Sequence, residues 1–340
     1  MSPEAGRAGP RVETRARRSS GGQSAIFEPS APSIYGTEDD ILGRADQGGD
    51  SLLVPLSAYT SFGVGGPVDY LVFPADLEDL QKALRWCRRG KVPYFFLGNG
   101  TNLLVRDGGV RGMAISLSRG FQGLAEVERR EETALIHAGA GVPLGRLLEF
   151  ACEKGLTGLE WAAGIPGTVG GAIFMNAGAF RGEMKDSLHS LELMDGDGAR
   201  VERKKEELQF SYRALEIKKG WAILGGKFSL RAGTSQAVRA RLNEFIQKRT
   251  AKQPLHLPSA GSVFKNPPRG KAGKLIEEVG LKGTRLRDAQ ISEKHANFIV
   301  NLGKARARDI LTLAEWAKNK VFEEKGVKLE MEIQVIGEDE

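Results

Sequence analysis

The sequence has few cysteines and histidines, from which disulfide frameworks and many metal centres are built, and it has no long apolar run. Among its 340 residues are only two cysteines, Cys87 and Cys152, and four histidines, and none has the spacing of a metal-binding motif. No apolar run approaches the length of a membrane span. These absences predict a cytoplasmic protein without a metal ion or a membrane segment, in which both cysteines are packing residues.

The charge is not concentrated in one sign. The formal net charge is +6, and acids and bases are mixed within the surface segment 202–207, ERKKEE. The sequence has no RNP aromatics, no zinc-finger spacing and no basic recognition helix, so we predict that nucleic acid is not a partner. The mild basic excess would suit an anionic substrate equally well.

The chain divides by composition into a tail and two domains. Residues 1–50 are rich in Gly, Ser, Pro and Arg, and we predict that they form a disordered tail. An α/β pattern follows, and its character changes after Ala232. We therefore predict one domain over residues 51–232 and a second over residues 233–340.

Hydrophobic periodicity predicts the elements of both domains. A helix begins after Asp76 and stops at Gly90, and further helices are expected over 143–154, 235–249, 272–278 and 307–325. Strands are expected near 68–73, 92–97, 103–105, 113–117, 134–138 and 288–301, with a last strand near the C-terminus. Residues 186–230 read as strand-rich, with a hairpin turn at Asp195–Gly198.

Three segments are rich in glycine. Gly98–Asn102 follows an apolar strand, and it reads either as an ordinary turn or as a phosphate nest. The segment 162–180 has more small residues than packing requires, and it favours a flat ligand lying on the main chain. Ala138–Gly145 has the spacing GxGxxxG with an intruding proline, so we interpret its glycines as turn residues rather than as a dinucleotide fingerprint.

Three isolated polar residues lie in motif-like settings far apart in the sequence. They are Arg213 in QFSYR, Ser262 in SAGSVFKNP and Glu332 in LEMEIQVIG. Taken singly, each also reads as structural, namely a strand arginine, a turn serine and an outward-facing glutamate. The pattern G-x-S-x-G is absent, so nucleophilic acyl transfer by the serine is not predicted.

Together these segments closely resemble the UDP-N-acetylenolpyruvoylglucosamine reductase family, flavoenzymes of bacterial peptidoglycan precursor synthesis. The resemblance runs from about Leu56 to Gly337. It is carried by the motifs Thr60-Ser-Phe, Val64-Gly-Gly-Pro-Val-Asp69, Leu97-Gly-Asn-Gly-Thr-Asn-Leu103, Gly164-Ile-Pro-Gly-Thr-Val-Gly-Gly-Ala172, Met175-Asn-Ala-Gly-Ala179, Phe210-Ser-Tyr-Arg213, Ala260-Gly-Ser-Val-Phe-Lys-Asn-Pro267, His295-Ala-Asn-Phe298 and Leu329-Glu-Met-Glu332.

The resemblance implies an α+β fold in which a two-subdomain FAD-binding region of the vanillyl-alcohol-oxidase type precedes a C-terminal α+β substrate domain. It implies the shorter form of the family, without the tyrosine-bearing loop, and we expect a monomer. NADPH and FAD are the implied cofactors, and a UDP-sugar is the substrate. The implied cofactor-binding residues are Gly98, Asn99, Gly100, Thr101, Asn102, Gly164, Ile165, Pro166, Gly167, Thr168, Gly170, Gly171, Ala172 and Asn176.

The resemblance also implies roles in catalysis. Arg213 and a protonated Glu332 stabilise the charge that develops on the enolpyruvyl group, and Ser262 protonates its C2 atom. The implied substrate- or phosphate-binding residues are Tyr212, Lys252, Lys265 and Asn266, with Arg249 as a further candidate. The chain departs from the family pattern at Gly63 (usually arginine), Arg181 (usually glycine) and Leu215 (commonly serine), which bears on FAD and substrate contacts.

Two other readings remain open at this point. A flavin oxidase of the same superfamily, acting on an alcohol or hydroxy acid, predicts rapid reaction of the reduced flavin with oxygen. A non-catalytic flavin- or nucleotide-binding module would keep the glycine segments but would need none of Arg213, Ser262 and Glu332.

Overall fold

The computed structural model describes residues 53–340, and the tail predicted over residues 1–50 lies outside this range. The first sheet has the strand order β1 (Val54–Pro55), β2 (Pro67–Val72), β5 (Val110–Ile115) and β3 (Tyr94–Phe96). Strand β5 is parallel to both β2 and β3, whereas β1 and β2 are antiparallel. The 3₁₀ helix η1 (Leu56–Tyr59) connects β1 to the loop before β2.

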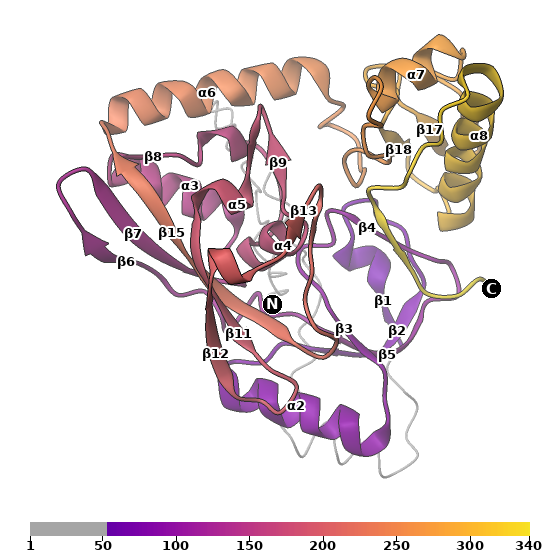
Figure 1. Cartoon of the computed structure of the whole chain (residues 1–340). Coiled ribbons are helices and arrows are strands. Elements are labelled where there is room, and N and C mark those ends of the chain that lie inside the picture. Colours follow the sequence, from indigo (N-terminus) through magenta and orange to yellow (C-terminus); the bar gives the residue numbers. More distant parts are fainter. Residues whose placement is uncertain (1–52) are drawn as a thin grey trace, which may run out of the picture. The chain divides into compact units, whose positions relative to one another are not determined.

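Helix α2 (Leu77–Gly90) packs against this first sheet (Figure 1). Asp76 caps the helix as predicted, because its carboxylate accepts a hydrogen bond of 2.9 Å from the N–H of Asp79. The predicted stop is displaced by one residue, since Gly90 is still helical and Lys91 takes the left-handed conformation, with φ of 54°. Strand β3 is shorter than the predicted 92–97, and Pro93, which has no N–H to donate, immediately precedes it.

The second sheet is antiparallel throughout. Its order is β12 (Arg200–Lys204), β11 (Leu188–Met194), β15 (Ala222–Ala232), β7 (Thr133–Gly139) and β6 (Leu124–Arg129), and β8 (Leu156–Thr157) also pairs with β15. Antiparallel pairing around β7 is incompatible with a Rossmann unit. Of the three glycines interpreted as turn residues, only Gly141 lies in the turn, whereas Gly139 ends β7 and Gly145 lies in the next helix. The polar edge strand β6 was not predicted from the sequence.

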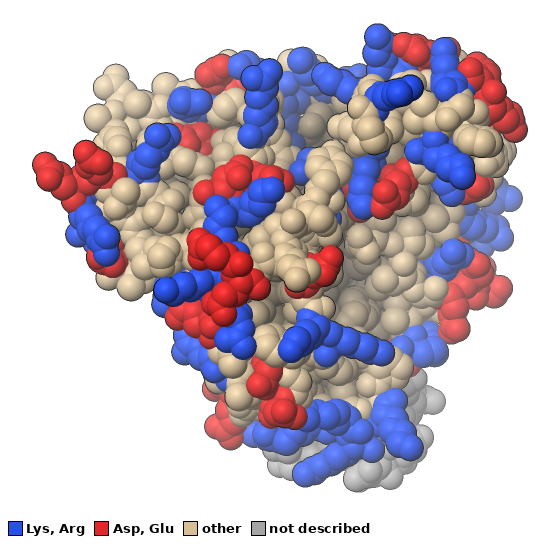
Figure 2. Space-filling view, viewed as in Figure 1, with Lys and Arg blue, Asp and Glu red and all other residues tan. Residues whose placement is uncertain are grey.

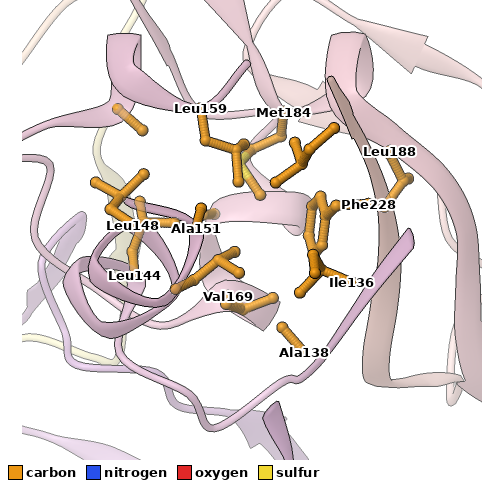
Figure 3. Close-up of a cluster of buried hydrophobic side chains, with 14 of the residues drawn as sticks. Ile136, Ala138, Leu144, Leu148, Ala151, Leu159, Val169, Met184, Leu188 and Phe228 are labelled. Atoms are coloured by element: carbon orange, nitrogen blue, oxygen red, sulfur yellow. The ribbon is translucent and has the colours of Figure 1, made fainter. Parts of the chain in front are cut away.

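Helices cover the second sheet and bury the largest apolar cluster of the first domain. Helix α3 (Leu144–Glu153), helix α4 (Val169–Phe174) and helix α5 (Met184–Ser187) contribute to it, and η2 (Glu160–Ala162) lies beside them. Figure 3 shows Leu144, Leu148 and Val169 directed toward Ile136 and Phe228 of the sheet. This cluster holds the segment 162–180 against the sheet.

Helix α6 (Ser235–Lys252) belongs to the same cluster, although it follows the predicted domain boundary at residue 232. Val238 and Leu242 are buried there, 3% and 5% exposed respectively. The boundary stays a prediction, and this packing favours a position after α6 rather than before it. The predicted end of the helix at 249 is extended by one turn.

The C-terminal part has its own core. Helix α7 (Ala272–Glu278) and helix α8 (Ala307–Lys325) pack on a sheet of β16 (Arg285–Leu286), β17 (Ala289–Ile291) and β18 (Ile299–Asn301). Both helices have the predicted bounds, and Gly326 ends α8 with a left-handed φ of 66°. This core also includes Phe62 from the first domain.

The chain returns to the first domain in its last strand. Strand β19 (Gln334–Ile336) pairs in parallel with β4 (Leu103–Val105), which directly follows the predicted cofactor loop. In Figure 1 the C-terminal segment accordingly runs beside β4. The pairing brings residues just before β19 close to the loop 98–102.

Three short elements complete the description. The hairpin β9 (Gly178–Ala179)–β10 (Gly182–Glu183) follows α4, and η3 (Lys205–Glu207) follows β12. The hairpin β13 (Phe210–Ser211)–β14 (Ala214–Leu215) comes next. Within residues 53–340 no helix is both long and apolar enough to cross a membrane.

Both cysteines are packing residues, as predicted. Cys87 and Cys152 are each 1% exposed, and each belongs to an apolar cluster. Burial raises the pKa of the Cys87 thiol to about 11, which keeps it protonated at neutral pH. Neither thiol is therefore a candidate nucleophile.

Candidate active site

Arg213 lies in a tight turn that forces it into an unusual backbone conformation. It is the second turn residue of the β13–β14 hairpin, with φ of 60°. A left-handed φ at a residue other than glycine stores strain, and such strain is concentrated at functional sites. The conformation directs the guanidinium across the chain: Nε donates a 2.9 Å hydrogen bond to Oε1 of Glu332, and Nη2 donates one of 2.7 Å to the carbonyl of Gly178.

Gly178 leaves the space that this guanidinium occupies. A Cβ atom at position 178 would lie 2.7 Å from Nη1 of Arg213, which is closer than side chains approach. The guanidinium carbon also lies 5.0 Å from the centre of the Tyr212 ring. Arg213 is thus fixed by a carboxylate, a carbonyl and an aromatic ring.

Glu332 is held by backbone contacts from two other segments. Its N–H donates to the carbonyl of Val263 at 2.8 Å, and its own carbonyl accepts from the Asn102 side chain at 3.0 Å. The carboxylate is 17% exposed. Burial raises its pKa above the ordinary value of a glutamate, whereas the charges of Arg213 and Lys265 oppose this rise.

Ser262 directly precedes Val263, whose carbonyl accepts a hydrogen bond from the N–H of Glu332. Asn297 fixes the segment: its backbone carbonyl accepts from Val263, while its side-chain amide both accepts from and donates to the backbone of Phe264 at 3.0 and 2.8 Å. The hydroxyl of Ser262 itself has no hydrogen-bond partner among residues 53–340. It is half-buried and remains available to a ligand.

The two predicted glycine segments lie against each other. The Thr101 hydroxyl donates to the carbonyl of Pro166 at 3.3 Å, and a Cβ atom on Gly98 would lie 3.0 Å from Oγ1 of Thr168. Gly98, Asn99, Gly164, Pro166 and Gly171 are exposed, and Thr101, Ile165 and Gly167 are partly exposed. The result is an accessible strip of backbone with few side chains, which fits a flat cofactor such as FAD.

Other residues of the predicted cofactor set support this strip from beneath. A Cβ atom on Gly100 would lie 2.0 Å from the carbonyl of Tyr59, and Thr168 caps α4 by accepting from Gly171. Gly170 and Ala172 are buried. Asn176 is fully buried, and its side chain binds Glu183, the carbonyl of Ser211 and the N–H of Lys185.

Asn102 and Arg249 connect the cofactor segments to other parts of the site. Asn102 contacts Glu332 as described above, and its carbonyl accepts from the N–H of Gln334. Arg249, on α6, is 9% exposed and donates to the carbonyl of Ala163, immediately before Gly164. Burial lowers the pKa of Arg249 to about 10, and none of the described carboxylates pairs with it. A buried cation of this kind favours an anionic or carbonyl ligand nearby.

Three of the four predicted substrate residues line one open hollow of about 490 Å³. They are Tyr212, Lys265 and Asn266, and the rest of the lining is Pro267, Pro268, Lys328 and Glu330. Lys252 is exposed at the end of α6, and no hydrogen bond or ion pair between described residues joins it to this group. The structure therefore brings together every predicted substrate residue except Lys252.

The charges on this face of the molecule are mixed (Figure 2). Lys and Arg side chains gather at the bottom of the view over α2, away from the β13–β14 hairpin, and elsewhere they alternate with Asp and Glu. Among residues 53–340 no three His, Cys, Asp or Glu side chains are grouped to bind a metal ion.

The three departures from the family pattern lie in different settings. Leu215 is 4% exposed and belongs to the apolar cluster of the first domain, so its side chain offers no polar contact. Gly63 and Arg181 both have left-handed backbones, with φ of 66° and 70° respectively. Glycine suits such a conformation at position 63, whereas the arginine at position 181 is strained.

Sequence reasoning missed several residues that support the site. Asn297 lies in the matched motif His295-Ala-Asn-Phe298, and this match was the only available signal for it. Gly178 and Ser61 also lie in matched motifs, Met175-Asn-Ala-Gly-Ala179 and Thr60-Ser-Phe, but neither motif indicates the contact that its residue makes. The Ser61 hydroxyl donates to the carbonyls of Gly100 and Ser259 at 3.3 and 2.7 Å, which joins the cofactor loop to the serine segment.

Comparisons with known proteins agree with this geometry. A model of the C-terminal domain of UDP-N-acetylenolpyruvoylglucosamine reductase matches residues 253–336, and an FAD binding domain model matches residues 68–203. These two matches confirm the predicted fold class.

Curated relatives and a solved structure extend the similarity to most of the chain. The UDP-N-acetylenolpyruvoylglucosamine reductase of Syntrophus aciditrophicus (strain SB) is 46% identical over 285 residues, 84% of this chain and 91% of the relative. That of Clostridium novyi (strain NT) is 43% identical over the same shares. The crystal structure of the reductase from Thermus caldophilus is 41% identical, with a TM-score of 0.71, and the alignment covers 83% of this chain and 97% of that chain. The chain therefore belongs to the UDP-N-acetylenolpyruvoylglucosamine reductase family.

Proposed function

We propose that this protein reduces the enolpyruvyl ether of UDP-N-acetylglucosamine to the lactyl ether, with NADPH as the source of electrons and FAD as the carrier. The observation that carries the proposal is the contact between Arg213 and Glu332 beside the hollow that contains Tyr212, Lys265 and Asn266. A binding module would not require a partly buried arginine that has a strained backbone and donates hydrogen bonds to two partners.

The accessible strip formed by the two glycine segments is suited to holding FAD. Gly98, Asn99, Thr101, Gly164 and Gly171 would contact it, and Arg249 would offer a cation beside Gly164. When bound, FAD would supply the hydride chemistry that links the reduced nicotinamide to C3 of the enolpyruvyl group.

The chain's own residues then have to stabilise the negative charge that develops on C2 and the adjoining carboxylate of the substrate. Arg213 carries a permanent charge and can bind a carboxylate through two N–H groups. The raised pKa of Glu332 favours its protonated form, which can donate a hydrogen bond, whereas an ionised carboxylate would repel the intermediate. The two residues thus stabilise the same developing charge.

Ser262 is proposed to supply the proton that completes the reaction at C2. Its hydroxyl is unpartnered among the described residues, and Asn297 fixes the neighbouring backbone. A serine is a weak acid, but the carbanionic carbon is a strong base, so transfer is feasible once the two groups are aligned. The balance is one hydride to C3 and one proton to C2.

The proposal further assigns the protein to peptidoglycan precursor synthesis in the cytoplasm and to a monomeric state. An anaerobic titration tests the central step. Protein containing FAD is reduced with NADPH, the excess is removed, and the enolpyruvyl UDP-sugar is added. Stoichiometric reoxidation with formation of the lactyl ether is expected. A flavin that stays reduced until air enters would favour an oxidase, and a protein that takes up no FAD would refute the whole proposal.

A further inference from the structure

The hollow beside Arg213 contains an ion pair that the proposed function does not explain. Lys265, a proposed phosphate ligand, forms an ion pair with Glu330, so a negative charge already occupies the position beside its ammonium group. Glu330 and Glu332 are two residues apart on one extended segment, and the N–H of Lys265 donates to the carbonyl of Glu330 at 2.9 Å. The pair is therefore built into the backbone that carries the site.

The carboxylate member of this ion pair, Glu330, is exposed to solvent. The Glu330 side chain is 72% exposed, whereas that of Lys265 is 24% exposed. An exposed ion pair contributes little free energy, because water and salt screen it. A diphosphate group, which carries one negative charge on each phosphorus, or a terminal phosphate can consequently displace Glu330 from Lys265, since the displaced carboxylate is already largely hydrated.

A second lysine in the same hollow has no ion-pair partner in the part of the chain that the structure describes. Lys328 lies on the lining, with its ammonium nitrogen 5.8 Å from the centre of the Phe322 ring. No carboxylate among residues 53–340 forms an ion pair with it. Lys328 therefore presents an uncompensated positive charge toward whatever enters beside Lys265.

We propose that Glu330 competes with the ligand's phosphate for Lys265, and that Lys328 is an additional cation for the same phosphate group. This inference rests on the proposed function, which uses two anionic ligands, the dinucleotide and the UDP-sugar, and it takes both to bind at this hollow in turn. A site that must release one polyanion before it admits the next benefits from a carboxylate that returns to the lysine. Glu330 thus lowers affinity and speeds exchange.

The test measures binding to the oxidised holoenzyme with UDP-N-acetylglucosamine, which has the diphosphate but no reducible group. Glu330→Gln is expected to bind it about two- to fivefold more tightly and to release it more slowly, because an exposed pair of this kind is worth at most about that factor. Lys328→Gln is expected to bind it about three- to tenfold more weakly, with a shallower dependence on salt.

Two further variants separate this effect from a general change of charge. Glu78→Gln removes an equally exposed acid, 73% exposed, from an ion pair with Lys82 on α2, and it should leave binding unchanged. The double variant Lys265→Gln, Glu330→Gln should bind no more tightly than Lys265→Gln alone, because without Lys265 there is no ion pair for Glu330 to form.

The source of the phosphate is decided by comparing ligands. If Glu330→Gln tightens UDP-N-acetylglucosamine alone, the competing group is the sugar diphosphate. If it tightens NADP⁺ more than NAD⁺, the competing group is the 2′-phosphate. Unchanged or weaker binding of both ligands to Glu330→Gln overturns the inference.

Failure of the proposed function would give a different result. In that case the wild-type protein would not bind UDP-N-acetylglucosamine at all, and inorganic pyrophosphate would then serve as the probe. Tighter pyrophosphate binding by Glu330→Gln would still support competition for Lys265, and equal binding by both proteins would refute it.

Discussion

Nε of Arg213 donates a 2.9 Å hydrogen bond to Oε1 of Glu332, across 119 residues of sequence. The two side chains are similarly shielded from solvent, 18% and 17% exposed. The two residues lie in different predicted domains. Arg213 lies in a hairpin turn of the first, and Glu332 lies in the segment before the last strand of the second. The contact therefore depends on the return of β19 to β4, which carries Glu332 back to the first domain.

Replacing Arg213 should remove charge stabilisation without abolishing cofactor binding. Arg213→Lys keeps the charge but cannot reach both Glu332 and the carbonyl of Gly178, so we expect reoxidation of reduced flavin by the UDP-sugar to slow by about 10²–10³-fold. Stopped-flow absorbance measures both half-reactions separately. If the flavin of the variant is reoxidised at the wild-type rate, the two hydrogen bonds of the guanidinium have no role in this step.

Glu332 should set the pH dependence of the second half-reaction, in which the UDP-sugar reoxidises the reduced flavin. Burial raises its pKa, so the protonated form persists above the usual range, and the rate is expected to fall as pH rises through that raised pKa. Glu332→Gln cannot ionise but can still donate a hydrogen bond, so the alkaline decline should disappear while part of the rate remains. Glu332→Ala should lose the rate at every pH. The prediction fails if Glu332→Gln retains the same decline.

Loss of the Ser262 hydroxyl should affect one half-reaction only. In Ser262→Ala we expect NADPH to reduce the flavin normally, and we expect product formation to slow by about 10²–10⁴-fold because the proton donor is missing. Ser262→Cys, which offers a different donor, should recover part of the loss. Equal damage to both half-reactions would contradict the assigned role.

Arg181→Gly should stabilise the protein. Arg181 has a left-handed φ of 70° in the β9–β10 turn, and this conformation costs a non-glycine residue about 1–2 kcal/mol. Glycine removes that cost but gains unfolded-state entropy, so a net increase of up to about 1 kcal/mol in the free energy of unfolding is expected. Denaturant unfolding of the FAD-free and FAD-bound protein measures it.

A second arginine-to-glycine change provides the matched control for this stability prediction. Arg85 is exposed within α2, where the backbone is helical, and Arg85→Gly should lower the free energy of unfolding by about 1 kcal/mol. Opposite signs for the two variants would support backbone strain as the cause. A decrease for both would show that Arg181 makes a favourable contribution greater than its strain.

Local patterns were sufficient to predict much of the fold. The bounds of α7 and α8 follow from periodicity and from Gly326, and Asp76 caps α2 as its position indicates. The edge strand β6 was missed because three of its six residues are charged and its apolar Val127 is exposed, so no buried apolar face marks it as a strand. The end of α2 was displaced because Lys91, rather than Gly90, adopts the left-handed conformation.

The sequence by itself determined most of the helices and strands, the glycine-rich segments and the family, because these depend on residues that are near one another in the chain or match motifs in order. Only the tertiary structure decided that Arg213 contacts Glu332, that Asn102 also contacts Glu332 and that Glu330 forms an ion pair with Lys265. These contacts join residues far apart in sequence, and their formation depends on how separate cores pack and on where the last strand pairs. Local propensity carries no information about such pairing.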